Sequence, residues 1–396
     1  MKKTLAAVAV LGAFAGSAMA ANVELYGSVS TGLVFSHTDS VTLDGKKASS
    51  KNSATMESAW AGDSVFGLTG EEELGNGWKV GFALENEFES DTGAMAGADD
   101  NKLFDSMSYL WVGNDTVKFA AGNLGGALSS AGGDFDLVGD FDPLEAAYGN
   151  GGMGLFATKD AAFDNAVAVE LTPVDGLTVS LQASLEDGSN EAVWSRRTHY
   201  YGVGAKYENG PLALTAVYEH VRPAHGETYT TSSTMDTTDE YKNMNFYTVG
   251  ASWDFEVVKP SFVYQHADKI SLASFAGGAL FGDLAEGYNY IEGDEVVAEA
   301  DLTGKTDSFL LGASAPLGDG TLGVSAQYMQ AKFENGAKFD DNTKGNAYVF
   351  GIAYSYELSK RTNLYAAGVY SHGSKAFKNV DTLNGYQIGF GLNHTF

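Results

Sequence analysis

The chain has 396 residues, of which 51 are acidic and 24 basic, so that its formal net charge at pH 7 is −27. This balance argues against nucleic acid as a partner, because binding phosphates needs basic surface. Its 44% hydrophobic and 12% aromatic residues exclude a solvated, disordered chain, and the lack of cysteine excludes disulfides, zinc thiolate sites and cysteine nucleophiles.

The first twenty residues predict export from the cytoplasm. Lys2 and Lys3 form a positive region, residues 5–14 are apolar, and Ala18-Met19-Ala20 is a small-residue cleavage signal. Because the apolar run is too short to span a bilayer, a cleaved signal peptide over 1–20 is favoured over a membrane anchor. Residues 21–396 show no linker and no break in composition, and we expect them to form one domain.

Beyond the signal, apolar residues alternate with small or polar residues at a period of two. Four clear stretches of this kind are 23–33, 78–88, 348–356 and 386–396. Each has about the ten residues that a tilted strand needs to cross hydrocarbon. A soluble sandwich has the same alternation. The small and polar partners, the aromatic residues near strand ends and the alternation of short and long connections favour lipid outside and water inside.

The connections between these stretches give the number of strands. Short turns are expected near 75–76, 114–115, 173–176, 209–210, 254–256, 318–320 and 359–361. Longer polar stretches lie at about 38–59, 91–103, 124–161, 187–196, 222–243, 268–306, 333–346 and 372–384. Seven turns and eight loops join sixteen strands. The sequence therefore predicts an all-β fold, a transmembrane antiparallel β-barrel with short periplasmic turns and long extracellular loops, in which closure satisfies every backbone group.

Four segments in this order resemble the general diffusion porins of Gram-negative bacteria. They are Leu25-Tyr26-Gly27, residues 63–80 (DSVFGLTGEEELGNGWKV), Ser359-Lys360-Arg361-Thr362 before a strand with Tyr365, and residues 391–396 (GLNHTF). The resemblance covers essentially the whole mature chain. It implies a homotrimer in the cell outer membrane, surrounded by lipid and lipopolysaccharide. It also implies a water-filled channel for passive diffusion of small hydrophilic solutes and ions, with no cofactor and no catalysis. The terminal Phe396 matches the residue that the barrel-assembly machinery reads in such proteins.

The resemblance also implies a third loop that folds into the barrel and narrows the pore. In this sequence the loop is 124–161, and it carries the acidic residues Asp134, Asp136, Asp140, Asp142 and Glu145. Carboxylates in a narrow pore attract cations, so we expect a cation preference, although these acids could also be solvated loop charges. Three further acids, Glu85, Glu87 and Glu89, are expected on the lumen wall.

The chain departs from the family at three positions that commonly hold arginine opposite the acidic loop. These positions hold Val65, Asn123 and Ala162. The substitutions predict a weak or inverted transverse field across the pore. Five other basic residues are candidates to replace the arginines: Lys79, Lys118, Arg196, Arg197 and Lys206.

Two other readings of the same residues are weaker. Asp134, Asp136, Asp140, Asp142 and Glu145 fit an EF-hand spacing, but Val138 occupies a ligand position, Pro143 lies inside and no helical pattern flanks the loop. We therefore expect no metal site there. The histidines lack a metal-binding spacing, and no GxSxG motif indicates a hydrolase.

The alternative function is a substrate-specific channel, or an adhesin whose long loops bind a ligand. An aromatic track along the lumen would favour a sugar channel. The candidates for such a track are Tyr200, Tyr201, Tyr207 and Tyr218. A position in the aromatic girdle at the membrane–water interface would explain these tyrosines equally well.

Overall fold

The computed structural model describes residues 22–41, 47–58, 60–96, 102–130, 133–145, 147–157, 164–185, 198–222, 243–271, 290–292, 295–297, 303–333, 343–379 and 383–396. The predicted signal peptide, residues 1–20, lies outside these residues and stays a prediction.

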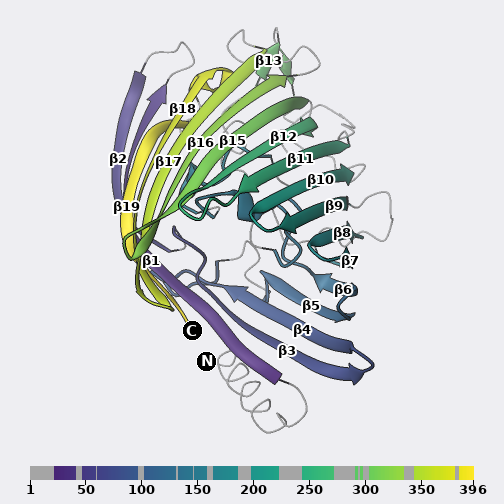
Figure 1. Cartoon of the computed structure of the whole chain (residues 1–396). Coiled ribbons are helices and arrows are strands. Elements are labelled where there is room, and N and C mark those ends of the chain that lie inside the picture. Colours follow the sequence, from purple (N-terminus) through teal and green to yellow (C-terminus); the bar gives the residue numbers. More distant parts are fainter. Residues whose placement is uncertain are drawn as a thin grey trace.

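Nearly all regular structure in the described residues is β-strand (Figure 1). The strands of the first half are β1 (Asn22–Val41), β2 (Lys47–Ser58), β3 (Val65–Gly75), β4 (Trp78–Glu87), β5 (Met107–Gly113), β6 (Val117–Asn123), β7 (Ala166–Val174), β8 (Leu177–Ser184) and β9 (His199–Asn209). Those of the second half are β10 (Leu212–Arg222), β11 (Met244–Trp253), β12 (Lys259–Ser271), β13 (Tyr290–Glu292), β14 (Glu295–Val297), β15 (Thr303–Leu317), β16 (Gly320–Phe333), β17 (Lys344–Ser359), β18 (Thr362–Lys375) and β19 (Asn384–Thr395).

All strands except the β13–β14 hairpin pair antiparallel in one closed sheet. The last strand, β19, pairs with β1 from Ser28↔Thr395 to Thr38↔Gly385, which closes the sheet into a barrel. On its other side, β1 pairs first with β3 and then with β2, so these two strands share one position around the barrel. The barrel therefore has sixteen strand positions, as predicted.

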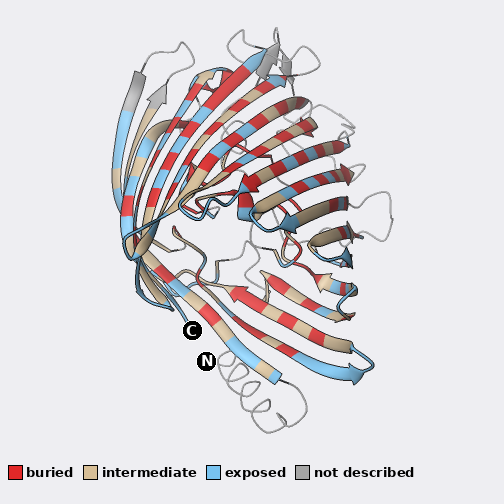
Figure 2. Cartoon of the chain, viewed as in Figure 1, coloured by how far each residue is buried: buried red, intermediate tan, exposed pale blue. Residues whose placement is uncertain are grey.

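The two faces of the wall differ in the way that the period of two predicts. Along β17, Tyr348, Phe350 and Ile352 are exposed on the outside, while Val349 and Gly351 between them are buried inside. Figure 2 shows the same alternation of buried and exposed residues along most strands. A lipid-facing surface of large apolar side chains and an interior of smaller ones is the pattern of an outer-membrane barrel.

All seven predicted turns lie between consecutive strands. At the β3–β4 turn, Asn76 and Gly77 both have positive φ (53° and 77°), the geometry that Asn-Gly favours in two-residue hairpins. At the β15–β16 turn, Gly318 has φ 62°. The residue types in the turns were therefore sufficient to locate the short connections, which all lie at one end of the barrel.

The predicted long loops are shorter than the sequence indicated. In the predicted loop 38–59, β1 continues to Val41 and β2 covers Lys47–Ser58, with pairs such as His37↔Asn52. Strands β12, β15, β17 and β18 likewise extend into predicted loops. Where a strand projects beyond the bilayer both faces meet water, so the hydrophobic alternation that marks a strand is lost although the hydrogen-bond ladder continues.

Three short 3₁₀ helices complete the described structure: η1 (Gly139–Phe141), η2 (Gly149–Gly151) and η5 (Ala376–Asn379). No helix in the described ranges has the length and apolar character needed to cross a membrane.

Candidate functional site

The longest connection between described strands, between β6 and β7, lies inside the barrel. We call its described part, within residues 124–157, the inner segment; residues 131, 132 and 146 are outside the described residues. Its apolar side chains are almost fully buried, including Leu124, Leu128, Phe135, Phe141 and Leu155. These side chains pack on the inner wall, so the inner segment has a hydrophobic underside although it lies in the lumen.

The start of the inner segment is hydrogen-bonded to β8, β9 and β10. Gln182 donates to the carbonyl of Gly126 (2.7 Å), and the hydroxyl of Tyr200 accepts from the N–H of Leu128 (3.0 Å). The buried carboxylate of Glu219 accepts from the Tyr200 hydroxyl and from Ser129. A buried carboxylate with several donors is a strong anchor, because losing a donor would leave its charge unsatisfied.

The end of the inner segment is bonded to β12, β15 and β16. Gln327 donates to the carbonyl of Gly151 (2.8 Å) and accepts from the N–H of Leu155 (3.2 Å). The Ser325 hydroxyl also donates to Gly151 (2.8 Å), and Gln265 accepts from the N–H of Ala157 (2.8 Å). Polar side chains that face the lumen thus satisfy backbone groups of a segment without regular structure.

Two glycines on the wall make room for the centre of the inner segment. A Cβ on Gly323 of β16 would collide with the carbonyl oxygen of Pro143, and one on Gly351 of β17 would collide with Leu144. Both glycines face the lumen, since they pair with Ala353 and Ser325 respectively. The segment can approach the wall this closely only because no side chains stand in between.

A tryptophan between β2 and β3 holds the inner segment from the other side. Trp60 is 7% exposed, and its carbonyl accepts from the N–H of Tyr148 (2.6 Å). The rings of Trp60 and Tyr148 meet edge to face with centroids 5.3 Å apart, and Tyr365 of β18 contacts both. The chain leaves the wall after Ser58 and re-enters it at Val65, which explains why β2 and β3 are separate strands.

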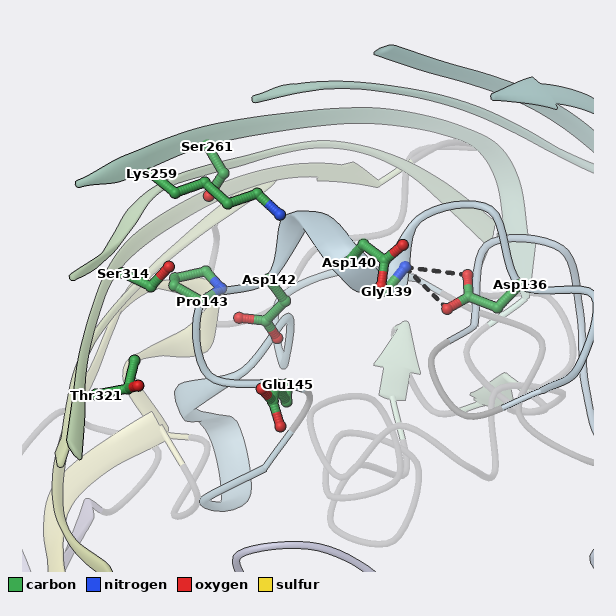
Figure 3. A pocket seen from close by; sticks show the side chains of 10 residues that line it. All are labelled: Asp136, Gly139, Asp140, Asp142, Pro143, Glu145, Lys259, Ser261, Ser314 and Thr321. Carbon is green, nitrogen blue, oxygen red and sulfur yellow. Dashed lines mark hydrogen bonds between the residues drawn. The ribbon is translucent and has the colours of Figure 1, made fainter. Parts of the chain in front are cut away.

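Four acidic side chains of the inner segment line one pocket of about 390 Å³ (Figure 3). They are Asp136, Asp140, Asp142 and Glu145, and Lys259, Ser261, Ser314 and Thr321 of the wall complete the pocket. Asp140 and Glu145 are exposed, whereas Asp142 is buried and accepts from the N–H of Leu144 (2.9 Å). Asp140 forms an ion pair with Lys206 of β9. The pocket therefore carries a net negative charge.

Asp136 combines burial with local hydrogen bonding. Its carboxylate accepts from the N–H groups of Val138 (2.7 Å) and Gly139 (2.9 Å), an Asx-turn arrangement. Burial raises the pKa of Asp136 to about 6, although these two donors lower it. Its charge therefore changes close to neutral pH.

Asp134 lies apart from that pocket. Its carboxylate accepts from the Tyr109 hydroxyl of β5, and burial raises its pKa above the usual range. It lines a second cavity, of about 690 Å³, together with Glu24 of β1, Glu71 of β3 and Lys118 of β6. This space lies between part of the inner segment and the wall of β1 and β3–β6.

A family model described as Gram-negative porin matches residues 6–376. The chain belongs to the Gram-negative porin family. An outer membrane porin protein of Bordetella pertussis is 29% identical over the full length of both chains. The fold is that of the anion-selective porin from Comamonas acidovorans (TM-score 0.61, 22% identity, 95% of this chain and 100% of that one). It is also that of in-vitro folded OmpT of Vibrio cholerae in its trimer form (TM-score 0.62, 15% identity, 95% and 100%). The porin is an outer-membrane protein.

Two of the predicted wall acids of the porin face the lumen from β4. Glu85 is 8% exposed and accepts from the hydroxyls of Tyr26 (2.9 Å) and Ser106 (2.6 Å). Glu87 pairs directly with Val65 of β3, so these two side chains share the lumen face. Glu89 lies beyond the end of β4, and its N–H donates to the carbonyl of Ala94 (2.8 Å).

The other predicted residues have different surroundings. Asn123 ends β6, and its amide donates to the carbonyl of Asp105 (2.9 Å) and accepts from the N–H of Gly125 (3.2 Å). It therefore shapes the entry into the inner segment. Ala162 lies outside the described residues. Phe396 is exposed on the outer face, and its backbone pairs with Gly27 of β1.

Three of the candidate cations face the lumen. Lys79 forms ion pairs with Glu71 (2.9 Å) and Glu73 (3.3 Å). Lys118 lies over the rings of Phe135, Trp111 and Tyr109, at 4.8, 5.6 and 6.0 Å from their centroids. Lys206 is the partner of Asp140. Arg196 and Arg197 lie outside the described residues.

The acids with EF-hand spacing do not surround a single point, although four of them line the same pocket. Asp134 contacts β5, whereas Asp136 and Asp142 bind backbone N–H groups of their own turns. In the part of the chain that the structure describes, no three His, Cys, Asp or Glu side chains lie close enough to hold a metal ion.

Three of the four candidates for an aromatic track do not line the lumen, as the alternative of an outer aromatic girdle allowed. Tyr201 and Tyr218 are exposed on the outer face, and Tyr207 shares that face of β9 with Tyr201. Tyr200 points inward, but the inner segment covers it. A strand places alternate residues on opposite faces, so Tyr200 and Tyr201 could not both have lined the lumen.

Sequence reasoning missed the residues that hold the inner segment: Trp60, Glu219, Gln265, Ser325 and Gln327. The only signal in the sequence was the alternation of inward and outward residues along the strands. Glu219 and the two glutamines stand at inward positions of strands otherwise lined by small residues.

Proposed function

We propose that this porin forms a water-filled channel for passive diffusion of small hydrophilic solutes and ions, and that it prefers cations. The inner segment narrows the lumen and its carboxylates line the constriction. The observation that carries this proposal is the acidic pocket of Asp136, Asp140, Asp142 and Glu145. In a narrow passage with low-dielectric walls, fixed negative charges raise the local concentration of cations and repel anions.

The wall opposite this pocket supports the same sign of selectivity. Val65 stands at an inward position where related porins commonly carry arginine, and its cross-strand neighbour is Glu87. The lumen-facing Lys79 and Lys206 are paired with carboxylates, so their charge is offset locally. The selectivity proposed here is opposite to that of the anion-selective Comamonas porin.

We further propose a homotrimer, the assembly named for the Vibrio OmpT structure. The exposed Phe396 at the end of β19 is the residue that the barrel-assembly machinery reads, and lipid and lipopolysaccharide cover the outer face.

The test is the zero-current potential of the purified porin in a planar bilayer across a potassium chloride gradient. The expected result is a cation-selective conductance whose steps appear in groups of three, one step for each channel of a trimer. An anion-selective potential would contradict the charge assignment. A folded porin without conductance would contradict the channel itself.

The selectivity should depend on pH between about 7.5 and 5.5. Because the pKa of Asp136 is about 6, its carboxylate loses its charge as the pH falls through this range. The lumen becomes less negative, so the cation preference falls with falling pH. Asp136→Asn should show a lower preference at pH 7.5 and a smaller change with pH. The zero-current potential, measured at five pH values in both proteins, checks this.

A further inference from the structure

The cavity of about 690 Å³ that Asp134 lines lies near the periplasmic end of the lumen. Its lining includes Glu71, which is close to the β3–β4 turn, and Lys118, which follows the β5–β6 turn. Short turns mark the periplasmic end of a barrel. Strands β1 and β3–β6 form this side of the wall (Figure 1). Sites for small molecules commonly have about 300–1,000 Å³, so the cavity has room for a solute.

The cation of this cavity, Lys118, is held by aromatic rings instead of a carboxylate. Its ammonium group is 4.8 Å from the centroid of the Phe135 ring and 5.6 Å from that of Trp111. Within the described residues Lys118 forms no ion pair, unlike Lys79 and Lys206. Aromatic rings attract a cation but do not neutralise it. The charge of Lys118 is therefore available to an anionic group that enters the cavity.

Carboxylates surround this ammonium group. Glu170 of β7 is directly opposite Lys118 in the β6–β7 ladder, so both side chains face the lumen. Asp134 accepts from the hydroxyl of Tyr109, whose ring centroid is 6.0 Å from the ammonium of Lys118. An acid and a cation thus contact the same ring. The exposed Glu24 of β1 also lines the cavity. The cavity therefore presents one positive group among several negative ones.

The indole of Trp111 gives the cavity an apolar surface. Gly81 is the neighbour of Trp111 across the β4–β5 ladder, and a Cβ there would come within 2.6 Å of three indole atoms. The glycine thus lets the indole lie close against the wall. Trp111 is only half-buried and lines the cavity. An aromatic side chain in such a position can pack against the ring of a solute.

We propose that this cavity binds zwitterionic aromatic solutes of the amino acid and dipeptide class. Lys118 binds the carboxylate of the solute, the surrounding acids bind its ammonium group, and Trp111 packs against its ring. A purely anionic solute would be repelled by the acids, and a purely cationic one by Lys118, whereas a zwitterion is attracted by both. The inference rests on the proposed channel, because a solute reaches the cavity only through a water-filled lumen.

The first test keeps the protein unchanged and varies the solute. The probe is L-phenylalanine, titrated into the folded porin in detergent micelles and followed by ligand-observed NMR, with protein-free micelles as the background. Three analogues each lack one feature: L-alanine lacks the ring, 3-phenylpropionate the ammonium group and phenethylamine the carboxylate. L-Phenylalanine should bind saturably, and each analogue should bind more weakly by roughly fivefold or more. Equal binding of any one analogue would overturn the proposal.

Two substitutions then locate the site. Lys118→Met keeps an apolar stem over the rings and removes the ammonium group, so L-phenylalanine should bind roughly fivefold more weakly. Phenethylamine has no carboxylate for Lys118, so it should bind this variant at least as well as the wild type. Trp111→Leu should weaken the binding of L-phenylalanine and leave that of L-alanine unchanged.

The matched control is Lys259→Met, which removes a lysine of the other lumen pocket and should bind L-phenylalanine like the wild type. An equal loss in this control, or parallel losses of L-phenylalanine and phenethylamine in Lys118→Met, would contradict the assignment.

Failure of this inference is distinguishable from failure of the proposed channel. A porin that conducts with a cation preference but binds L-phenylalanine no better than the analogues overturns the inference alone. A folded porin without conductance contradicts the channel, and the binding measurement, which needs no current, still decides whether the cavity is a site.

Discussion

Replacing Asp136 and Asp140 by Asn and Glu145 by Gln should lower the potassium-to-chloride permeability ratio by about sevenfold. A change of about one kT in the lumen potential produces this factor, because the energies of the two ions shift in opposite directions. Asn is itself a good Asx-turn residue, so the turn at Val138 and Gly139 keeps its acceptor. Losing Asp140 also leaves Lys206 without this partner, which shifts the ratio the same way.

The matched control replaces Asp175 and Asp319 by Asn and Glu256 by Gln. These three acids are exposed in the short periplasmic turns between β7 and β8, β15 and β16, and β11 and β12, where salt screens their fields. Removing the same number of charges there should change the permeability ratio much less. Equal changes in the two triple variants would show that the inner segment does not form the selective constriction.

The substitution Gly323→Val should displace the inner segment and raise the single-channel conductance. Its Cβ would collide with the carbonyl oxygen of Pro143, a backbone atom that can move only with the segment. The control is Gly368→Val on the outer face of β18, where the nearest atoms are 3.8 and 4.0 Å from an added Cβ. That variant should conduct like the wild type. The measurement is the step size in a planar bilayer, with heat-modifiable gel migration as the check of folding.

A second variant covers the case in which Gly323→Val does not fold. Ser325→Ala with Gln327→Ala removes the hydrogen bonds to Gly151 and Leu155 and adds no bulk. It should loosen the same end of the inner segment and increase current noise and conductance. A folded double variant with unchanged conductance would mean that these contacts do not set the width of the pore.

The barrel could be predicted from local patterns. Stretches such as 348–356 alternate strictly, and each places large side chains on the lipid face. Gly-containing turns such as 76–77 and 318–319 separate them. Both signals depend only on neighbours in the sequence, so strand number, closure and membrane side followed without any long-range contact. The same reasoning overestimated the loops, because β1 and β2 continue where both faces are polar.

The sequence by itself determined the kind of protein: a chain whose alternating segments close into an outer-membrane porin barrel, with an acidic third connection. Only the tertiary structure decided how that connection lies. Trp60, Glu219 and Gln327 hold it from positions 88–176 residues away in sequence. Likewise, only the register of β15, β16 and β17 makes Lys305, Lys332 and Lys344 cross-strand neighbours. The alternation of residues along a strand predicts which face each side chain is on. Which residue that side chain contacts, across the sheet or across the lumen, depends on strand register and long-range packing.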